Sequence, residues 1–346
     1  MSVEMKTVPP TRTFFISLFI IWVGLSFAIN ANGQRGLGNL TDVRALQEKI
    51  WTAERGTPDQ AVAAMREAVE QFKTNSTAWY YYGLALSRSG DLVGARNTFK
   101  QALKFEPSFI QSRLRLAQTL LLANQFHEAE TEARRALEPD AKAADAHYIL
   151  GQVYLSCGDA SKALAEALAS IQTHSSFAPA FLLKHQATLL MLGRSKLEQQ
   201  PQQLKDAIES LEKYFALAQP QANDGFLLEQ LESLRFYLKA ADEDAHSPNR
   251  QLFYASEVTT KAHIFTKPPP EYSETARLVH MVGAVVLAAV LSGDGNLEHI
   301  LVLRSLPYGL SAKSIEAAKK VRFTPATKDG HAVSTWTQLE YNFNLY

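Results

Sequence analysis

Small residues recur every 34 positions over a long part of the chain, and this period restricts the fold more than any other feature. Three sets of positions share it: Gly83, Ala117 and Gly151; Ala61, Ala95, Ala129 and Ala163; and Ala68, Ala102, Ala136 and Ser170. A period of about 20 to 50 residues is typical of solenoids, which stack copies of one supersecondary unit. Small side chains at fixed positions let two helices approach closely, so we expect stacked helical hairpins.

The fullest copy of the repeat is WYYYGLALSRSGDLVGARNTFKQALKFEP, at residues 79–107. It resembles the tetratricopeptide repeat (TPR). The positions that carry this resemblance are Trp79, Tyr82, Gly83, Ala95, Phe99, Ala102 and Pro107. Gly90-Asp91 and Gly158-Asp159 are turn signals between paired helices. The resemblance covers roughly residues 40–218, and a last helix at residues 226–240 is expected to cap the solenoid.

The TPR resemblance implies that the first helix of each repeat lines a concave groove. The residues expected there are Tyr80, Leu84, Arg88, Leu114, Gln118, Leu121, Tyr148, Gln152 and Leu155. The Lys/Asn clamp that some family members use for a terminal carboxylate is missing, so an apolar and aromatic groove for an extended or helical segment is favoured. The alternative is that several of these residues pack between repeats. The sequence favours neither ligand binding nor packing for these positions.

The N-terminus carries an apolar run, FFISLFIIWVGLSFAI, at residues 14–29, after Lys6 and Arg12. Small and polar residues follow it up to Gln34, which is the pattern of a cleaved secretory signal. The run also approaches the length of about 20 residues that spans a bilayer, so a retained anchor is the alternative. Because the positive charges precede the run, both interpretations place the rest of the chain outside the cytoplasm.

Composition excludes several classes of function. Lys plus Arg and Asp plus Glu both number 35, so no basic excess favours nucleic acid. The single cysteine, Cys157, cannot form an intrachain disulfide, and its place at the end of an apolar helix predicts a small buried side chain. The nine histidines lack metal-ligand spacing, and no nucleophile elbow or phosphate loop occurs. We therefore expect no catalytic residues, no metal, no cofactor and no enzymatic activity.

The C-terminal part changes from helical periodicity to strand periodicity. From Thr337 apolar and polar residues alternate, as in a strand with one buried face. Two apolar runs joined by GDGN at residues 293–296 predict a hairpin. Short helices are expected at residues 272–279 and after Ser311, an expected N-cap. Together these elements predict a three-stranded antiparallel sheet covered on one face by two helices.

This pattern resembles the C-terminal domain of TonB, the periplasmic energy transducer of Gram-negative bacteria, over residues 258–346. Its most specific element is Phe323, Pro325, Ala326, Asp329 and Gly330. Two features depart from TonB proper: helical repeats stand in place of the long Pro-rich spacer, and Pro269-Pro270 replaces the usual Gln-Pro.

The expected organisation is an α solenoid followed by a small α+β domain. Residues 1–33 form the signal peptide or membrane anchor, 34–240 the TPR-like domain, 241–257 a linker and 258–346 the TonB C-terminal-like domain.

The TonB resemblance implies a binding site on the closing strand. In such domains the last strand leaves one edge free, where the TonB box of an outer-membrane receptor adds as a further strand. The residues expected at this edge are Trp336, Thr337, Gln338, Leu339, Glu340, Tyr341, Asn342, Phe343 and Asn344. Trp336, Gln338 and Glu340 are the expected side-chain neighbours of a docked peptide.

Both resemblances together imply a periplasmic TonB-family interaction protein in transmembrane transport. It would bind TonB-dependent outer-membrane receptors by β-strand addition and other envelope partners through its repeats. Inner-membrane motor subunits are further candidate partners, with membrane anchorage through residues 14–29. The alternative is a cell-envelope assembly scaffold that uses the TonB-like domain for docking alone.

Overall fold

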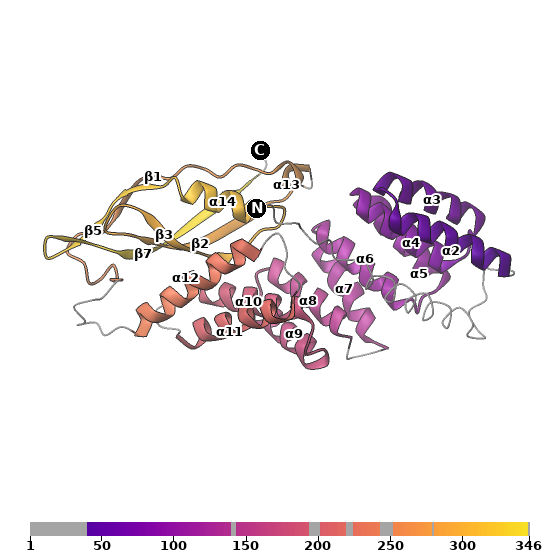
Figure 1. Cartoon of the computed structure of the whole chain (residues 1–346), viewed down its shortest axis with the longest axis horizontal. Coiled ribbons are helices and arrows are strands. Elements are labelled where there is room, and N and C mark those ends of the chain that lie inside the picture. Colours follow the sequence, from indigo (N-terminus) through magenta and orange to yellow (C-terminus); the bar gives the residue numbers. More distant parts are fainter. Residues whose placement is uncertain are drawn as a thin grey trace, which may run out of the picture. The chain divides into compact units, whose positions relative to one another are not determined.

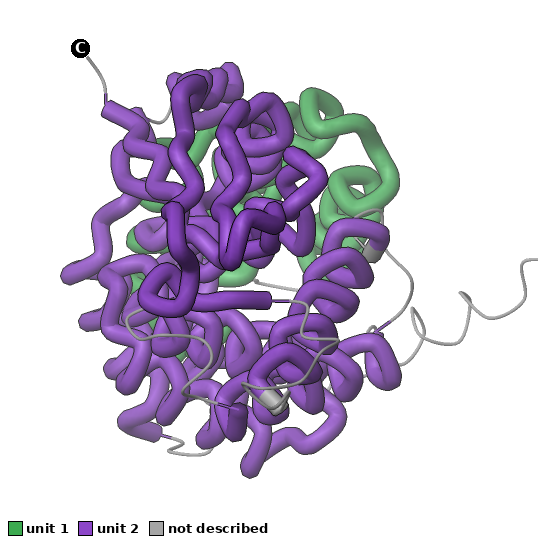
Figure 2. Tube along the Cα trace, turned by 90° about the vertical axis from the view of Figure 1, so that its left-hand side faces the viewer, with its two compact units in different colours: residues 1–112 green, residues 113–346 purple. Residues whose placement is uncertain are grey.

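The computed structural model describes residues 40–139, 143–193, 201–218, 224–242, 252–278 and 280–344. The chain divides into two compact units, residues 1–112 and residues 113–346 (Figure 2). The expected signal or anchor and the middle of the expected linker, residues 243–251, lie outside the described residues.

Helical hairpins form the first unit and the beginning of the second (Figure 1). The helices are α2 (Leu40–Arg55), α3 (Pro58–Gln71), α4 (Ser76–Ser89), α5 (Leu92–Phe105), α6 (Ile110–Leu122), α7 (Phe126–Leu137), α8 (Ala144–Ser156), α9 (Ala160–Thr173), α10 (Ala178–Leu192), α11 (Pro201–Leu217) and α12 (Asp224–Asp242). Helices that follow one another pack together within each unit, for example α4 with α5 and α8 with α9. The prediction of a TPR-like solenoid is confirmed.

Local sequence sets the ends of these helices. Thr57 caps α3 by accepting a hydrogen bond from the Gln60 N–H, and the Gln60 side chain accepts one from the Thr57 N–H. Asp91 and Asp159 cap α5 and α9 with their carboxylates. Gly90, with φ of 88°, ends α4 in the left-handed conformation that favours glycine. The predicted turn signals therefore act where the sequence places them.

The repeated small residues lie where helices touch. Ala61, Ala95, Ala129 and Ala163 are completely buried. A Cβ atom at Gly83 would lie 2.5 Å from the ring of Phe99, and one at Gly151 would lie 2.4 Å from the side chain of Leu183. No side chain fits at such distances, so the glycines allow the close packing of these helices.

A three-stranded antiparallel sheet in the order β3-β2-β7 forms the C-terminal part. Its strands are β2 (Gly283–Leu291), β3 (Leu297–Arg304) and β7 (Thr335–Phe343). Two short ladders join β1 (His263–Thr266) to β4 (Arg322–Thr324) and β5 (Ala326–Lys328) to β6 (His331–Val333). The predicted hairpin between β2 and β3 is confirmed, and Gly295 in its turn has φ of 91°.

Helices cover both faces of this sheet (Figure 1). On one face, α13 (Glu274–Leu278) and α14 (Leu310–Ala318) share a core with Leu287, Leu339 and Phe343. On the other face, residues of α10, α11 and α12 share a core with Val290 and Leu303. A strand buried on both faces needs a continuous apolar sequence, which explains GAVVLAAVL in β2.

The predicted three strands and two helices are confirmed, and two details differ from expectation. One covered face was expected, but the repeat helices α10, α11 and α12 cover the second. Ser311 is not the N-cap of α14, because Gly309 with φ of 78° precedes a helix that already begins at Leu310. The Ser311 hydroxyl instead donates a hydrogen bond to the Leu306 carbonyl.

Candidate functional site

β7 pairs with β2 over its whole length, from Thr335 opposite Leu291 to Phe343 opposite Gly283. The odd-numbered side chains Leu339, Tyr341 and Phe343 are buried in the core beneath α13 and α14. The side chains of Gln338, Glu340, Asn342 and Asn344 are exposed. The alternation in sequence therefore gives the strand one buried face, as expected.

One edge of β7 faces away from β2. The carbonyl oxygen of Glu340 accepts a hydrogen bond from the Lys267 ammonium at 2.6 Å, so this carbonyl points outward. In an antiparallel pair the N–H and C=O of one residue point to the same side, and successive residues alternate. The outward groups are therefore those of the even-numbered residues Trp336, Gln338, Glu340 and Asn342, and the odd-numbered residues bond to β2.

The first part of this edge is already paired. Phe253 forms a parallel bridge with Thr335, and the Phe253 N–H donates to the Ser334 carbonyl at 2.9 Å. An added strand would therefore meet open backbone groups beyond Trp336, which is a shorter stretch than residues 336–344.

A lysine covers the middle of the edge. The Lys267 ammonium binds the Glu340 carbonyl and lies 4.9 Å from the centre of the Tyr341 ring. Burial raises the pKa of Tyr341 to about 12, so this ring stays a neutral phenol. Lysine at a sheet edge protects against uncontrolled pairing with other strands. Among the described residues no strand pairs with the outward groups of Gln338 and Asn342.

The three expected side-chain neighbours of a docked peptide differ in their surroundings. Trp336 is partly buried against the core that the sheet shares with α10–α12. The Gln338 amide donates to the Gly193 carbonyl at 3.0 Å, just after α10. Glu340 is exposed. Contact between these side chains and a peptide stays a prediction, and Gln338 and Glu340 are both exposed.

The opposite edge of the sheet is closed by side chains of α12. Gln230 is 2% exposed, and its amide oxygen accepts from the Val302 N–H at 2.7 Å while its amide nitrogen donates to the Ile300 carbonyl at 3.0 Å. The Tyr237 hydroxyl donates to the His299 carbonyl at 3.0 Å. These side chains take the place of a neighbouring strand along β3. The signal that sequence reasoning missed is a pair of polar residues, Gln230 and Ser233, in an otherwise apolar helix stripe.

The expected groove residues of the first unit lie on α4. They are Tyr80, Leu84 and Arg88. The Tyr80 ring packs against Phe109, with 5.1 Å between ring centres. The Arg88 guanidinium donates to the carbonyls of Ala53 and Gly56, at 2.7 Å and 3.1 Å. Ala53 lies in the last turn of α2, and Gly56 directly follows that helix. Arg88 therefore joins consecutive hairpins, which supports the packing alternative for this residue.

The other expected groove residues lie on α6 and α8, and all are partly buried. They are Leu114, Gln118, Leu121, Tyr148, Gln152 and Leu155. The Gln152 amide donates to the Tyr148 hydroxyl at 2.9 Å, and the Tyr148 ring meets Phe177 edge-on. Binding of a ligand by these residues stays a prediction.

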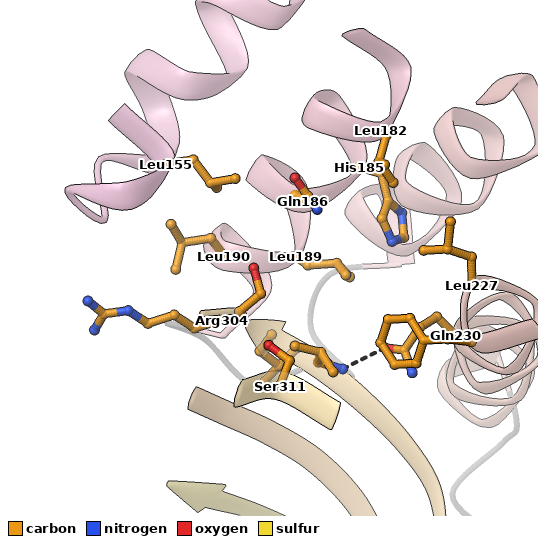
Figure 3. Close-up of a pocket in the computed structure, with 14 residues that line it drawn as sticks. Leu155, Leu182, His185, Gln186, Leu189, Leu190, Leu227, Gln230, Arg304 and Ser311 are labelled. Atoms are coloured by element: carbon orange, nitrogen blue, oxygen red, sulfur yellow. Dashed lines mark hydrogen bonds between the residues drawn. The ribbon is translucent and has the colours of Figure 1, made fainter. Parts of the chain in front are cut away.

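A pocket of about 140 Å³ lies between α8, α10, α12 and the end of β3 (Figure 3). Leu155 belongs to its wall, so the last expected groove residue of α8 faces this space. His185 of α10 also lines it. The His185 Nδ1 donates to the Ala207 carbonyl at 2.9 Å, and burial lowers the pKa of His185 to about 4. His185 is therefore a neutral, fixed ring.

The described residues hold no cluster of histidine, cysteine and carboxylate side chains suited to a metal ion. The expectation that Cys157 is buried is wrong, because this residue follows the last turn of α8 and is exposed. Desolvation and the nearby carboxylates of Glu130 and Asp159 raise the pKa of the Cys157 thiol. A thiol with a raised pKa is a poor nucleophile near neutral pH.

Residues 268–345 match the family model of the Gram-negative bacterial TonB protein C-terminal domain. The chain carries a TonB C-terminal domain. Residues 53–108 and 86–151 each match a tetratricopeptide repeat family, so this domain follows TPR repeats. TonB C-terminal domains and TPR repeats are protein-interaction modules, which indicates protein partners, and a TonB C-terminal domain is typical of an envelope protein.

Solved TPR proteins resemble this chain at low identity. PilW, a type IV pilus biogenesis factor, is 22% identical with a TM-score of 0.48, and the match covers 59% of this chain and 90% of PilW. MamA from Desulfovibrio magneticus RS-1 is 20% identical with a TM-score of 0.41, over 52% of this chain and 94% of MamA. No curated protein matches the chain. Within the described residues, no helix has the length and apolar character needed to cross a membrane.

Proposed function

We propose that this protein is a periplasmic TonB-family interaction protein that takes part in transmembrane transport and has no enzymatic activity. The edge of β7 binds an extended segment of a TonB-dependent outer-membrane receptor by strand addition, and the repeats bind further envelope partners. One observation carries the proposal: α12 closes the β3 edge of the sheet through Gln230, while the β7 edge keeps outward backbone groups without a strand partner among the described residues.

Backbone groups supply most of the binding energy in this mode. The outward N–H and C=O groups of Gln338 and Asn342 and the N–H of Glu340 accept a neighbouring strand, and Lys267 gives up the Glu340 carbonyl when that strand arrives. Each net hydrogen bond contributes about 0.5–1.5 kcal/mol, so a few such bonds give a reversible contact. A transport cycle needs that reversibility, because the receptor must be released.

Proline at position 340 tests the proposal in the full chain. Pro lacks the N–H that an added strand needs, and this N–H points away from β2, so Glu340→Pro is expected to keep the fold. Its affinity for a TonB-box-like peptide should fall at least about tenfold, whereas Glu340→Ala should bind like the parent. Calorimetry measures binding and circular dichroism reports the fold. Equal affinity of the Pro and Ala variants would show that the peptide does not add at this edge.

The assembly scaffold is a second candidate, favoured by a separate observation. The sheet shares a core with α10, α11 and α12, so the TonB C-terminal domain is fixed to the last repeat helices rather than carried on a long spacer. In a scaffold, the β7 edge docks a partner and no transport follows. Deletion of the gene separates the two functions: loss of uptake through a TonB-dependent receptor supports transport, and unchanged uptake with defective envelope assembly supports the scaffold.

Energy transduction also needs an anchor and motor subunits. Residues 14–29 would supply the contact to inner-membrane motor subunits if they remain attached. Mass spectrometry of the protein from membrane and soluble fractions decides between the two N-termini. A mature start near Gln34 supports the cleaved signal, and an intact Met1 in the membrane fraction supports the anchor.

A further inference from the structure

The pocket beside β3 has an apolar wall with unfilled space. Five leucines from three helices surround it: Leu155, Leu182, Leu189, Leu190 and Leu227. Its volume of about 140 Å³ is close to that of an apolar cavity of about 150 Å³ that holds a benzene-sized molecule. The space therefore accommodates one aromatic ring.

His185 offers an unused hydrogen-bond acceptor to this space. The residue is 2% exposed, and its ring points from α10 into the pocket (Figure 3). Since Nδ1 donates to the Ala207 carbonyl, Nε2 carries the lone pair of a neutral imidazole. Burial lowers the pKa of His185 to about 4, which agrees with this tautomer. Among the described residues none donates to Nε2, so its lone pair is open to a donor that enters the pocket.

Arg304 gives the rim of the pocket a positive charge. It is the one charged residue among those that line the space, and its side chain leaves the pocket past Leu190 toward Gly158 (Figure 3). No described carboxylate forms an ion pair with it. A lone cation beside an apolar space attracts an anionic group of a ligand.

We propose that this pocket anchors a peptide segment of a partner protein that carries a Trp or Tyr side chain next to an acidic residue. The aromatic ring fills the apolar space, its N–H or O–H donates to His185 Nε2, and the carboxylate pairs with Arg304. The pocket continues the face of α8 on which Tyr148 and Gln152 precede Leu155, so a peptide along that face reaches it. The inference rests on the proposed function of the repeats as a protein-binding surface.

Three short peptides separate the contributions. They are acetylated and amidated Gly-Ala-Trp-Glu, Gly-Ala-Trp-Gln and Gly-Ala-Phe-Glu, titrated into the full chain with labelled leucine methyl groups. Gly-Ala-Trp-Glu is expected to shift the methyl signals of the five pocket leucines. Removing its carboxylate should weaken binding about threefold to fivefold, as for a partly exposed ion pair. Replacing Trp by Phe removes the donor to His185 and should weaken binding about tenfold.

Arg304→Gln completes the test, with Arg322→Gln as the matched control at an exposed position of β4. Arg304→Gln should reduce the affinity for Gly-Ala-Trp-Glu to that for Gly-Ala-Trp-Gln and leave the latter unchanged. Arg322→Gln should change neither affinity. Circular dichroism of both variants confirms that they fold.

Several results would overturn the proposal. Equal affinities of the three peptides, or no shift of the pocket leucines at millimolar peptide, exclude this anchor site. Shifts on α6 and α8 without shifts in the pocket leave the proposed role of the repeats intact and remove the pocket from it. Free N-acetyl-tryptophan that binds as tightly as Gly-Ala-Trp-Glu identifies a site for small aromatic acids instead of a peptide anchor.

Discussion

Single residues set how closely the repeat helices approach. Gly83 faces the ring of Phe99, and Gly151 faces Leu183, at distances that leave no room for a methyl group. Gly225 in the first turn of α12 differs, because a Cβ atom there would meet nothing within 4 Å. Gly83 and Gly151 therefore have a packing role, and Gly225 does not.

This contrast predicts that replacing glycine by alanine changes the free energy of unfolding differently at Gly83 and at Gly225. Gly83→Ala should lower the free energy of unfolding by about 1–3 kcal/mol, because the new methyl group overlaps the Phe99 ring. Gly225→Ala should leave that free energy unchanged or raise it by up to about 1 kcal/mol, since alanine restricts the unfolded chain. Urea titration measures both. Equal effects of the two substitutions would argue against close packing at Gly83.

His185 predicts a dependence of stability on pH. Burial lowers its pKa from 6.5 to about 4, so the unfolded chain binds a proton at a higher pH than the folded chain does. The free energy of unfolding should therefore fall as the pH drops from about 6.5 to about 4, by up to about 3 kcal/mol, and this contribution should level off below pH 4. Urea titrations of the parent and of His185→Gln across this range measure it. Identical pH slopes would contradict the buried neutral ring.

At the level of elements, α12 acts as a substitute strand. Its Gln230 amide bonds to the N–H of Val302 and the carbonyl of Ile300, as the backbone of a neighbouring strand does. The side chains of Tyr237 and Ser233 add bonds to the carbonyls of His299 and Ile300. The open edge of the sheet is then the one along β7.

Gln230→Leu should remove this closure. It leaves the Val302 N–H without its acceptor and removes the closer of the two donors to the Ile300 carbonyl, so the free energy of unfolding should fall by about 1–3 kcal/mol. The Val302 amide should exchange its hydrogen faster with solvent. Glu229→Gln, at the exposed neighbouring position, is the matched control and should change neither quantity. An unchanged exchange rate at Val302 in Gln230→Leu would show that α12 does not close the edge.

The sequence predicts elements whose signals are local and periodic. The repeat period shows where alanines meet, and the alternation from Thr337 shows which face of β7 is buried. Closure of β3 involves residues 72 positions apart, Gln230 and Val302, and no periodicity connects them. The covering of the second sheet face is missed for the same reason. Exposure of Cys157 is missed because the α8 periodicity does not extend to its C-cap.

At the level of the whole molecule, the expected boundary between repeats and C-terminal domain crosses a shared core. Leu189 and Leu192 of α10 and Leu234 of α12 pack with Leu301 and Leu303 of β3, all within residues 113–346. The division of the chain at residues 241–257 stays a prediction about sequence segments. The shared core predicts that the segments before and after this boundary stabilise each other.

Leu303→Ala tests this coupling. Leu303 is 2% exposed, so its truncation should cost about 2–5 kcal/mol. Hydrogen exchange should rise in α10 and α12 as well as in β3, because these elements share one core. Leu168→Ala on α9 is the control in the same unit, since that side chain is 48% exposed and should cost little. Faster exchange confined to β3 would mean that the sheet and the repeat helices unfold separately.

The amide exchange of β7 tests strand addition at the sheet edge most directly. We expect a TonB-box-like peptide to slow hydrogen exchange at the outward amides of Gln338, Glu340 and Asn342, because each gains an acceptor on the added strand. The inward amides of Leu339 and Tyr341 already bond to β2 and should change little. A bound peptide that leaves the three outward amides unprotected, or that protects the β3 edge instead, would contradict strand addition at β7.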